Sequence, residues 1–359
     1  MVDLIVFKTI SINSHKGRYN VFFKNNLNNI IKDFDFKNSH LIIDKKVFSF
    51  YENFFRKLPN INRSLIIQSN EKNKSLEKIP KYINWLVENK IKKSHNIVAI
   101  GGGIIQDITC FISATLLRGV EWNFIPTTLL SQADSCIGSK SSINCNNVKN
   151  ILGTFTPPKN VLIYSEFLKT LQLREIKSGI GEMLKVHAIS GVNDFNSIKK
   201  VYKDLFTKQD IMLDKIYKSL IIKKKFIEID EFDKGLRNIF NYGHSFGHAI
   251  ERATNFKIPH GIAVSMGCDL ANFTSMKLGI CSEKYYLNMS STLQENYKSF
   301  RKINIDRSLF YDALSKDKKN VNNDSFSLVL PNGESKIFID KYKNNKKIRS
   351  IIDKFFNNL

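Results

Sequence analysis

Residues 96–107 read NIVAIGGGIIQD, and this stretch predicts how the N-terminal half of the chain folds. Asn96–Ile100 is a short apolar run suited to a central parallel strand. Gly101-Gly102-Gly103 follows directly, and Ile108–Leu117 reads as a helix. A strand, a glycine turn and a helix in this order present free N–H groups and the positive end of a helix dipole to a phosphate. Because the spacing is not G-x-G-x-x-G, the turn alone predicts no dinucleotide, and a plain tight turn stays an alternative.

Strands and helices alternate around this stretch, which predicts an α/β domain over residues 1–165. A helical pattern runs from Ile79 to Lys93, and the apolar strand patterns are His40–Asp44, Ser64–Gln68, Trp122–Ile125 and Val161–Tyr164.

Helical periodicity dominates from Glu166 onwards, which predicts an α-helical second domain over residues 166–359. The expected helices are Glu175–Ile189, Leu213–Phe226, Gly235–Thr254, Gly261–Leu278, Leu309–Ser315 and one surface helix within Lys341–Leu359. One short extended run, Phe326–Leu330, ends in a Pro-Asn-Gly turn.

The composition is that of an ordinary globular protein. The chain has 359 residues, a net charge of +22 and five scattered cysteines. The cysteines favour thiols in the cytoplasm over a disulfide framework, and neither a secretory signal nor an apolar run long enough for a bilayer occurs. Since the basic residues are spread along the whole chain, we expect a solvated surface that attracts an anionic metabolite, and neither nucleic acid nor membrane as a partner.

Two polar stretches are candidate sites with simple structural alternatives. Residues 134–150 hold Asp134, Lys140, Asn144, Lys149 and Asn150 with little helix or strand character, so we expect a loop that either binds substrate or merely lies on the surface. Glu182 and Lys185 lie three apart on one helix face, where an ordinary intrahelical salt bridge is the simplest interpretation.

The densest set of chemical groups lies between Asp230 and His260. It holds three of the seven histidines, and His244 and His248 are four apart on one predicted helix, as in metal-binding pairs. A third ligand could come from His260, in a loop after that helix, or from a distant carboxylate such as Glu182. Histidines with one carboxylate suit a catalytic zinc ion, and the absence of HExxH disfavours a zinc peptidase.

Together these stretches resemble the 3-dehydroquinate synthase family of the sugar phosphate cyclases. The matching segments are GGGIIQD (101–107), TLLRG (115–119), PTTLLSQADSCIGSK (126–140), KN (149–150), GIGEMLK (179–185), GLRNIFNYGHSFGHAIE (235–251) and HG (260–261). The resemblance implies an NAD-binding α/β domain, an α-helical metal- and substrate-binding domain, an active site in the cleft between them, and a homodimer.

The reaction implied by the resemblance belongs to the shikimate pathway of aromatic amino acid biosynthesis. The family converts 3-deoxy-D-arabino-heptulosonate 7-phosphate to 3-dehydroquinate and phosphate. It does so by transient oxidation with NAD, phosphate elimination, re-reduction, ring opening and aldol cyclisation. The implied cofactors are NAD and Zn²⁺, with Co²⁺ as a second possible metal.

The resemblance also implies residue roles. The expected NAD-binding residues are Asp44, Glu71, Lys74, Gly102, Gly103, Asp107, Thr127 and Thr128. The expected metal ligands are Glu182, His244 and His260. The expected substrate and catalytic residues are Asp134, Lys140, Lys149, Asn150, Lys185, Lys223, Arg237, Asn241 and His248, with Asp134, Lys140 and Lys149 also near the cofactor. Arg118 is expected to reach a neighbouring subunit's site, and either Lys318 or Lys319 to approach the substrate.

Several positions depart from the family pattern beside these pockets. They are Asn70, Gln106, Ser139, Ser141, Ser142, Val148 and Asp233, the last standing where Glu is usual. These departures bear on substrate identity and leave open another sugar phosphate cyclase. A metal-dependent polyol dehydrogenase would not need the lysines, and a nucleic-acid-binding protein would not explain the histidines. Arg237 and Asn241 favour a substrate with a carboxylate, as in the dehydroquinate branch.

Overall fold

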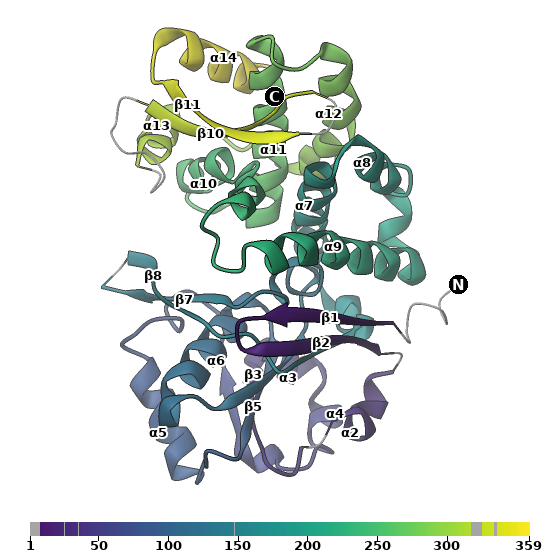
Figure 1. Cartoon of the computed structure of the whole chain (residues 1–359), viewed down its shortest axis with the longest axis vertical. Helices are drawn as coiled ribbons and strands as arrows, with labels where there is room; N and C mark the ends of the chain where they lie inside the picture. The colour runs from purple at the N-terminus through teal and green to yellow at the C-terminus, as the bar shows by residue number, and fades with distance from the viewer. Residues whose placement is uncertain (1–7, 25, 35, 147, 317–324, 334–335) are drawn as a thin grey trace. The chain divides into compact units, whose positions relative to one another are not determined.

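The computed structural model describes residues 8–24, 26–34, 36–146, 148–316, 325–333 and 336–359 (Figure 1). The chain forms two compact units, of which the first comprises Met1–Leu171 with Lys224–Phe232, and the second Gln172–Lys223 with Asp233–Leu359. The chain therefore passes between the units three times, whereas the sequence suggested a single boundary after residue 165. The prediction of an α/β unit and a mainly helical unit is confirmed.

The first unit is built on a seven-stranded sheet. Its first two strands are antiparallel and every later pair is parallel. The strands, in spatial order, are β1 (Thr9–Ser14), β2 (Gly17–Lys24), β9 (Asn160–Tyr164), β6 (Glu121–Pro126), β5 (Asn96–Gly101), β3 (Ser39–Asp44) and β4 (Ser64–Ile67). The parallel strands β3, β5, β6 and β9 are buried, as their apolar runs predicted. The edge strand β4 is only partly buried, and its Ile66 is 42% exposed.

The strand order places a switch of direction between β3 and β5. The chain runs from β3 outward to β4 and then returns to β5 on the other side of β3. Ligands of open α/β sheets bind at the carboxyl ends of the strands at such a point. Here those ends carry Asp44 and the glycine turn at 101–103, so the topology itself selects this edge for a ligand.

The first unit also contains the helices α2 (Ile30–Asp33), α3 (Lys45–Phe50), α4 (Glu52–Phe55), α5 (Ile79–Glu88) and α6 (Gly103–Thr115), with short 3-10 turns between several elements. Of these, α3 and α6 contact strands of the sheet, and α5 contacts α6. One core cluster combines alternate residues of β3 and β5, namely Leu41, Ile43, Val98 and Ile100, with side chains that include Phe55.

The expectation of a loop over residues 134–150 is wrong. Ser131–Ser135 forms a π-helical turn, and β7 (Lys140–Cys145) pairs with β8 (Val148–Phe155) as an antiparallel hairpin. The sequence carried a signal for it, because Asn146-Asn147 lies between the two runs and Asn146 adopts φ 48°, as hairpin turns often require. The hairpin β1–β2 was also not predicted.

The β1–β2 turn is fixed by the segment that returns from the second unit. Glu228 Oε1 accepts a hydrogen bond of 2.8 Å from the Asn13 amide. Glu231 accepts bonds of 2.8 Å from the His15 amide and 2.6 Å from the Ser14 hydroxyl. Residues 224–232 are therefore an integral part of the first unit.

The second unit surrounds one buried helix, α11 (His260–Lys277), whose residues Gly261–Ser275 are all buried. Against it pack α7 (Leu173–Ser190), α10 (His244–Ala253), α12 (Glu283–Tyr297), α14 (Lys346–Asn357) and β10 (Ser325–Pro331). The unit also contains α8 (Val192–Lys199), α13 (Arg307–Ser315) and most of α9 (Gln209–Ile229). Across the stretches of chain that the structure describes, no helix is both long and apolar enough to span a bilayer.

Three details of the second unit differ from the sequence expectations. The helix expected over 235–254 is two elements, the 3-10 segment η7 (Leu236–Asn241) and α10, because Gly243 adopts φ 76°. His260 begins α11 and does not lie in a loop. The unit is not all-helical, since β10 pairs with β11 (Ile337–Lys343), which occupies the first part of the expected C-terminal helix.

Candidate active site

The glycine turn after β5 offers open space at the start of a helix. Gly102 caps α6 without a side-chain hydrogen bond, and a Cβ atom on Gly103 would meet nothing within 4 Å. The Thr127 amide donates to the Gly101 carbonyl at 2.9 Å, while the Thr127 hydroxyl oxygen is buried with no hydrogen-bond partner among the residues that are described. The uncapped N–H groups and this hydroxyl suit a bound phosphate group.

A buried polar network lies beside this turn. Lys74 is 5% exposed, and its Nζ atom lies 3.0 Å from Asp107 Oδ2 and 2.8 Å from Asn150 Oδ1. Asn144 accepts from the Asn150 amide at 3.0 Å and donates to Glu71 Oε2 at 2.8 Å. The structure thus brings together Glu71, Lys74, Asp107 and Asn150, all predicted from the resemblance. Asn144, which joins them, belongs to the polar stretch singled out in the sequence but was given no role there, because its hairpin was not predicted.

Within this network the positive charge of Lys74 stabilises the carboxylate of Asp107. Burial raises the pKa of Asp107, and the Lys74 ammonium opposes that rise. The Ser142 amide also donates to Asp107 Oδ1 at 3.2 Å. Ser142, a departure from the family pattern, therefore meets the network through its backbone.

The remaining predicted residues of the first unit occupy separate positions. Asp44 caps α3 by accepting from the Lys46 amide at 2.7 Å, and the Thr128 hydroxyl lies 2.8 Å from Ser131 Oγ. Lys140 and Lys149 are exposed on β7 and β8, and Asp134 lies in the π-helical turn. Arg118 is exposed, with φ 59°.

Gln106 has a structural use that its place in the sequence did not reveal. Its side chain donates to the Ser135 carbonyl at 2.6 Å and accepts from the Ser135 hydroxyl at 2.7 Å. These bonds tie α6 to the turn that carries Asp134. The glutamine at position 106, which departs from the family pattern, therefore holds the turn at Ser131–Ser135 in place.

In the second unit, glycines let three helices approach closely. A Cβ atom on Gly181 of α7 would lie 1.9 Å from the Gly261 carbonyl oxygen of α11, and one on Gly261 would lie 1.8 Å from the Ser178 oxygen. A Cβ atom on Gly243, before α10, would lie 2.4 Å from Cys268 Sγ of α11. Only glycine permits these contacts, which set Glu182, His244 and His260 side by side.

Glu182 is at the centre of this cluster. Its Oε1 atom lies 3.1 Å from His260 Nε2 and 3.5 Å from His244 Nε2, and its Oε2 atom lies 2.7 Å from Lys185 Nζ. The Glu182 and Lys185 side chains are 2% and 3% exposed. The pair is therefore a buried ion pair and not the surface salt bridge that the spacing alone suggested. Lys185 also lies 5.5 Å from the centre of the Phe240 ring.

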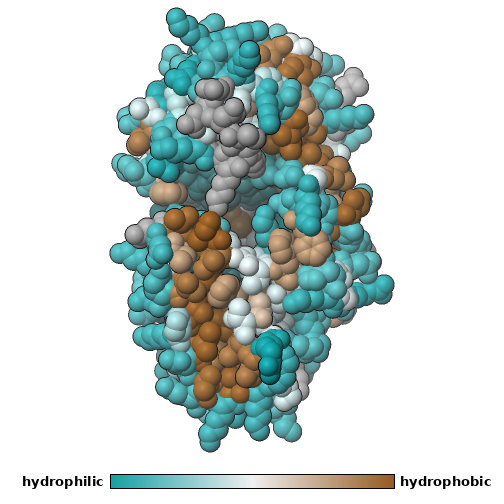
Figure 2. Space-filling model, turned by 60° about the vertical axis from the view of Figure 1, so that its left-hand side comes forward, coloured by the Kyte–Doolittle hydropathy of each residue, from teal (hydrophilic) through white to brown (hydrophobic). Residues whose placement is uncertain are grey.

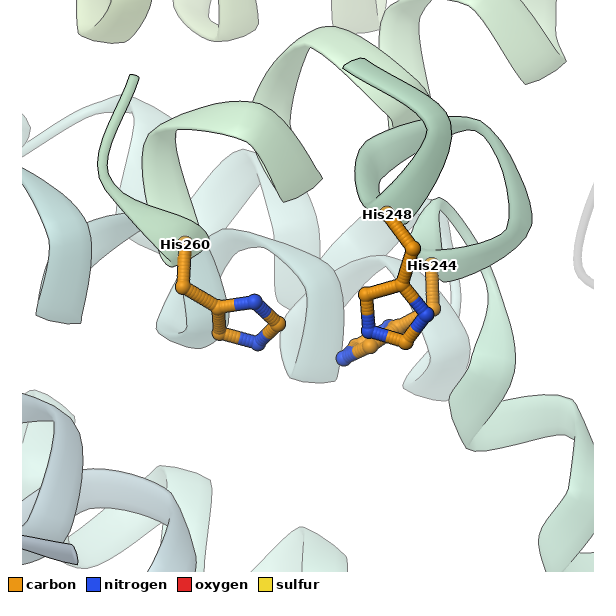
Figure 3. Close-up of side chains that lie close together, drawn as sticks. All are labelled: His244, His248 and His260. Atoms are coloured by element: carbon orange, nitrogen blue, oxygen red, sulfur yellow. The ribbon is translucent and has the colours of Figure 1, made fainter. Parts of the chain in front are cut away.

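The three histidines face one another (Figure 3). His244, His248 and His260 each offer one nitrogen, and these nitrogens lie within 4.8 Å of one another. His244 Nδ1 lies 3.3 Å from the Tyr242 carbonyl, which can only accept, so Nε2 keeps its lone pair. The α10 pair predicted from i,i+4 spacing is confirmed as a neighbouring pair of rings, 5.3 Å apart.

The donor set fits a divalent metal. Donor atoms around tetrahedral zinc are about 3.3–3.5 Å apart, given zinc bond lengths of about 2.0–2.2 Å. The distances from Glu182 Oε1 to His260 and His244, 3.1 and 3.5 Å, are close to that spacing. An alternative donor set consists of His244, His248 and His260, in which His248 is exposed and takes the place of the buried Glu182.

The charges of the cluster also favour a cation. Burial disfavours the Glu182 carboxylate, but Lys185 with His244 and His260 outweighs this and holds its pKa well below the usual range. Burial, aided by Lys185, keeps the pKa of His244 well below its usual value. Burial lowers the pKa of His260, but Glu182 and Glu251 outweigh it and raise that pKa to about 10. The two carboxylates thus favour a positive charge at His260, and a bound metal would supply such a charge in place of the proton.

The other predicted residues of this unit are distributed around it. Arg237 is buried in η7, the segment that also carries Phe240 and Asn241 and packs against α7. Asn241 donates to the Asn238 carbonyl at 3.0 Å, and Lys223 is buried in α9. Asp233, just before η7, adopts φ 60°. Lys318 and Lys319 lie outside the described residues.

Two family models match this chain. The model for the 3-dehydroquinate synthase N-terminal region matches residues 64–178, and that for the C-terminal region matches residues 179–320. A 3-dehydroquinate synthase from Clostridium tetani is 38% identical, covering 94% of this chain and 93% of that protein. One from Helicobacter pylori strain P12 is 33% identical, covering 82% and 84%.

Solved structures share the fold. ValA, a 2-epi-5-epi-valiolone synthase from Streptomyces hygroscopicus with NAD⁺ and Zn²⁺ bound, aligns with a TM-score of 0.81 at 21% identity, covering 95% of this chain and 97% of that chain. A 2-deoxy-scyllo-inosose synthase with carbaglucose-6-phosphate, NAD⁺ and Co²⁺ aligns with a TM-score of 0.80 at 19% identity, covering 98% and 100%. An iron-containing alcohol dehydrogenase aligns with a TM-score of 0.62 at 13% identity, covering 94% and 97%. The resemblance predicted from the sequence is confirmed, and this chain belongs to the 3-dehydroquinate synthase family.

Proposed function

We propose that this chain converts 3-deoxy-D-arabino-heptulosonate 7-phosphate to 3-dehydroquinate and phosphate, with NAD and Zn²⁺ or Co²⁺ as cofactors. The observation that carries the proposal is the buried Glu182–Lys185 pair facing His244 and His260. It combines a candidate metal site with a cation suited to an anionic substrate. Membership of the family supports the choice of reaction.

The two cofactors would be held by different units. Glu182, His244 and His260 would hold the metal, and the turn at Gly102–Gly103 with the network around Lys74 would hold NAD. When bound, the metal supplies polarisation of a hydroxyl group and NAD supplies reversible hydride transfer.

The protein side chains bind and orient an anionic sugar phosphate. Lys185 is fixed by Glu182 and by the Phe240 ring, so its ammonium is oriented before substrate arrives. Asp134, Lys140, Lys149, Asn150, Lys223, Arg237, Asn241 and His248 are proposed to contact the phosphate, hydroxyl or carboxylate groups. Arginine and lysine make strong charge-assisted hydrogen bonds to such groups.

Related activities make distinct predictions. The structural neighbours include a valiolone synthase, an inosose synthase and an alcohol dehydrogenase. A dehydrogenase would accumulate NADH, whereas the proposed cycle returns each hydride. Arg237, buried in the segment that packs against α7, supports a substrate with a carboxylate.

The test is an assay of purified protein with the heptulosonate phosphate, catalytic NAD and Zn²⁺. Release of phosphate with formation of dehydroquinate supports the proposal. Phosphate release from other sugar phosphates only would move the chain to a different cyclase, and NADH in amounts equal to product would identify a dehydrogenase.

We also propose that the chain acts as a homodimer in the cytoplasm. All five cysteines carry free thiols, which suits that compartment. One face of the first unit shows an apolar strip (Figure 2). Separately, Leu117 and Ile151 are among the large apolar side chains of this unit that are exposed. Leu117 and Arg118 both have positive φ, at 50° and 59°, and Lys93 donates to the Arg118 carbonyl, so this segment has a defined conformation.

Mixed dimers test whether Arg118 acts in the site of a partner subunit. R118A and K185A would each be inactive alone. A dimer containing one copy of each would have one intact site, so random mixing would restore about a quarter of wild-type activity. A monomer in solution, or no restoration after subunit exchange, would refute the proposal.

A further inference from the structure

The last turn of α10 carries a carboxylate that the expected site did not include. Glu251 follows His244 by seven residues and His248 by three, so the three side chains lie on one face of the helix. Glu251 Oε2 lies 3.2 Å from His260 Nδ1, and the Glu251 side chain is 13% exposed. Glu251 thus contacts the candidate metal ligand that begins the next helix.

The connection between the two helices brings these groups together. Asn255 and Phe256 both have positive φ, at 49° and 59°, and α10 packs against α11. The chain therefore reverses tightly, and the end of α10 faces the start of α11. Arg252, the next residue on α10, forms an ion pair with an acid on α13, with 3.8 Å between its Nη2 atom and Asp312 Oδ2.

The contact determines which nitrogen of His260 is available. A neutral imidazole has one N–H donor and one acceptor nitrogen, and a carboxylate can only accept. His260 Nε2 faces Glu182 Oε1 at 3.1 Å, and these are the two atoms that would share a metal ion. With a metal on Nε2, the one remaining proton of the ring lies on Nδ1, facing Glu251. His244 is oriented in the same way by the Tyr242 carbonyl.

Helix stability does not explain a glutamate at this position. The carboxyl end of a helix carries partial negative charge, so an acid in the last turn is unfavourable there. Position 251 lies in the last turn of α10, which ends at Ala253. The contact with His260 provides a reason for the acid that the helix itself does not.

We infer that Glu251 is a positioning residue, which holds His260 with Nε2 directed at the metal and makes that nitrogen a stronger ligand. This inference rests on the proposed metal site but not on the identity of the sugar phosphate. Carboxylate partners of metal-binding histidines have this effect in other proteins, where their loss weakens metal affinity about 10–100-fold.

The test measures Zn²⁺ binding by the metal-free full-length protein in competition with a chromophoric chelator. E251A is expected to weaken Zn²⁺ affinity about 10–100-fold. E251Q keeps a neutral acceptor, so it is expected to lose less, about threefold or more, because charged acceptors form stronger bonds. E283Q removes the same charge from the exposed first turn of α12 and should bind Zn²⁺ like the wild type.

The visible spectrum of bound Co²⁺ provides a second readout, since a rotated His260 ring changes the ligand field. Wild-type Zn²⁺ affinity and an unchanged Co²⁺ spectrum in E251Q would overturn the inference, even if E251A does not fold. If the wild type binds Zn²⁺ and turns over but both variants bind equally well, only the role of Glu251 fails. If the wild type binds no Zn²⁺, the proposed metal site fails with it.

Discussion

Replacing Gly181 by alanine tests whether close helix packing builds the metal site. The new Cβ atom would lie 1.9 Å from the Gly261 carbonyl oxygen, while real Cβ contacts are essentially never under 3.0 Å. The two helices must therefore separate by about 1.1 Å or more, a case of overpacking in a tight core. The two nearest Gly261 atoms belong to the backbone, so rotation of the nearby Ser265 side chain cannot relieve the clash.

The shift acts directly on the candidate ligands, because Glu182 follows Gly181 and His260 precedes Gly261. A displacement of about 1 Å would take the distance between Glu182 Oε1 and His260 Nε2 from 3.1 Å to about 4 Å, wider than the spacing of about 3.3–3.5 Å between donor atoms around tetrahedral zinc. We expect G181A to cost about 1–3 kcal/mol of unfolding free energy and to weaken Zn²⁺ affinity about 10–100-fold.

Thermal unfolding and chelator competition measure the two effects. G103A is a matched control, because its Cβ atom would meet nothing within 4 Å, and it should leave Zn²⁺ affinity and stability nearly unchanged while weakening NAD binding. A G181A protein with wild-type Zn²⁺ affinity and an unchanged melting temperature would refute the reasoning.

Three further substitutions probe other contacts. F240L removes the ring 5.5 Å from Lys185 Nζ and should lower kcat/KM about 2–30-fold in steady-state assays with Zn²⁺ affinity unchanged; equal kinetics would contradict it. N144A leaves the Asn150 amide without its acceptor and should cost about 1–3 kcal/mol in denaturant unfolding and weaken NAD binding in calorimetry, whereas unchanged NAD affinity would separate the network from the cofactor. Burial lowers the pKa of His187 to about 4, so its neutral form contributes stability that is present above pH 6.5 and lost as pH falls towards 4. Lowering the pH from 7.5 to 5 should therefore cost about 2 kcal/mol that H187Q does not lose, as compared by chemical denaturation at both pH values.

Local patterns in the sequence were sufficient for part of the fold and of the site. The strand, glycine turn and helix at 96–115 follow from short-range periodicity and from the backbone freedom of glycine. The pairing of His244 with His248 follows from helical spacing alone. In both cases the deciding interactions lie within one turn or one element.

The parts that could not be derived from local patterns depend on contacts between distant segments. Glu182 meets His260 because Gly181 and Gly261 allow α7 and α11 to touch, and nothing near Glu182 in the sequence reports this. Only the family resemblance paired the two residues before the structure did. The polar network around Asn144 depends on a hairpin whose Asn-Asn turn is a weak signal, and the burial of Lys185 depends on a whole unit.

The segment Lys224–Phe232 has a consequence for how the protein is made. The first unit is finished only when Glu228 and Glu231 reach the turn at Asn13–His15. After Leu171 the ribosome must synthesise about sixty more residues, which are the first part of the second unit followed by this segment, before the first unit is complete. This synthesis takes about 3–12 s. During that interval the nascent N-terminal hairpin lacks its acidic partners. A chaperone that binds then would find the β1–β2 turn without these hydrogen bonds, and a chain truncated by a premature stop would never form them.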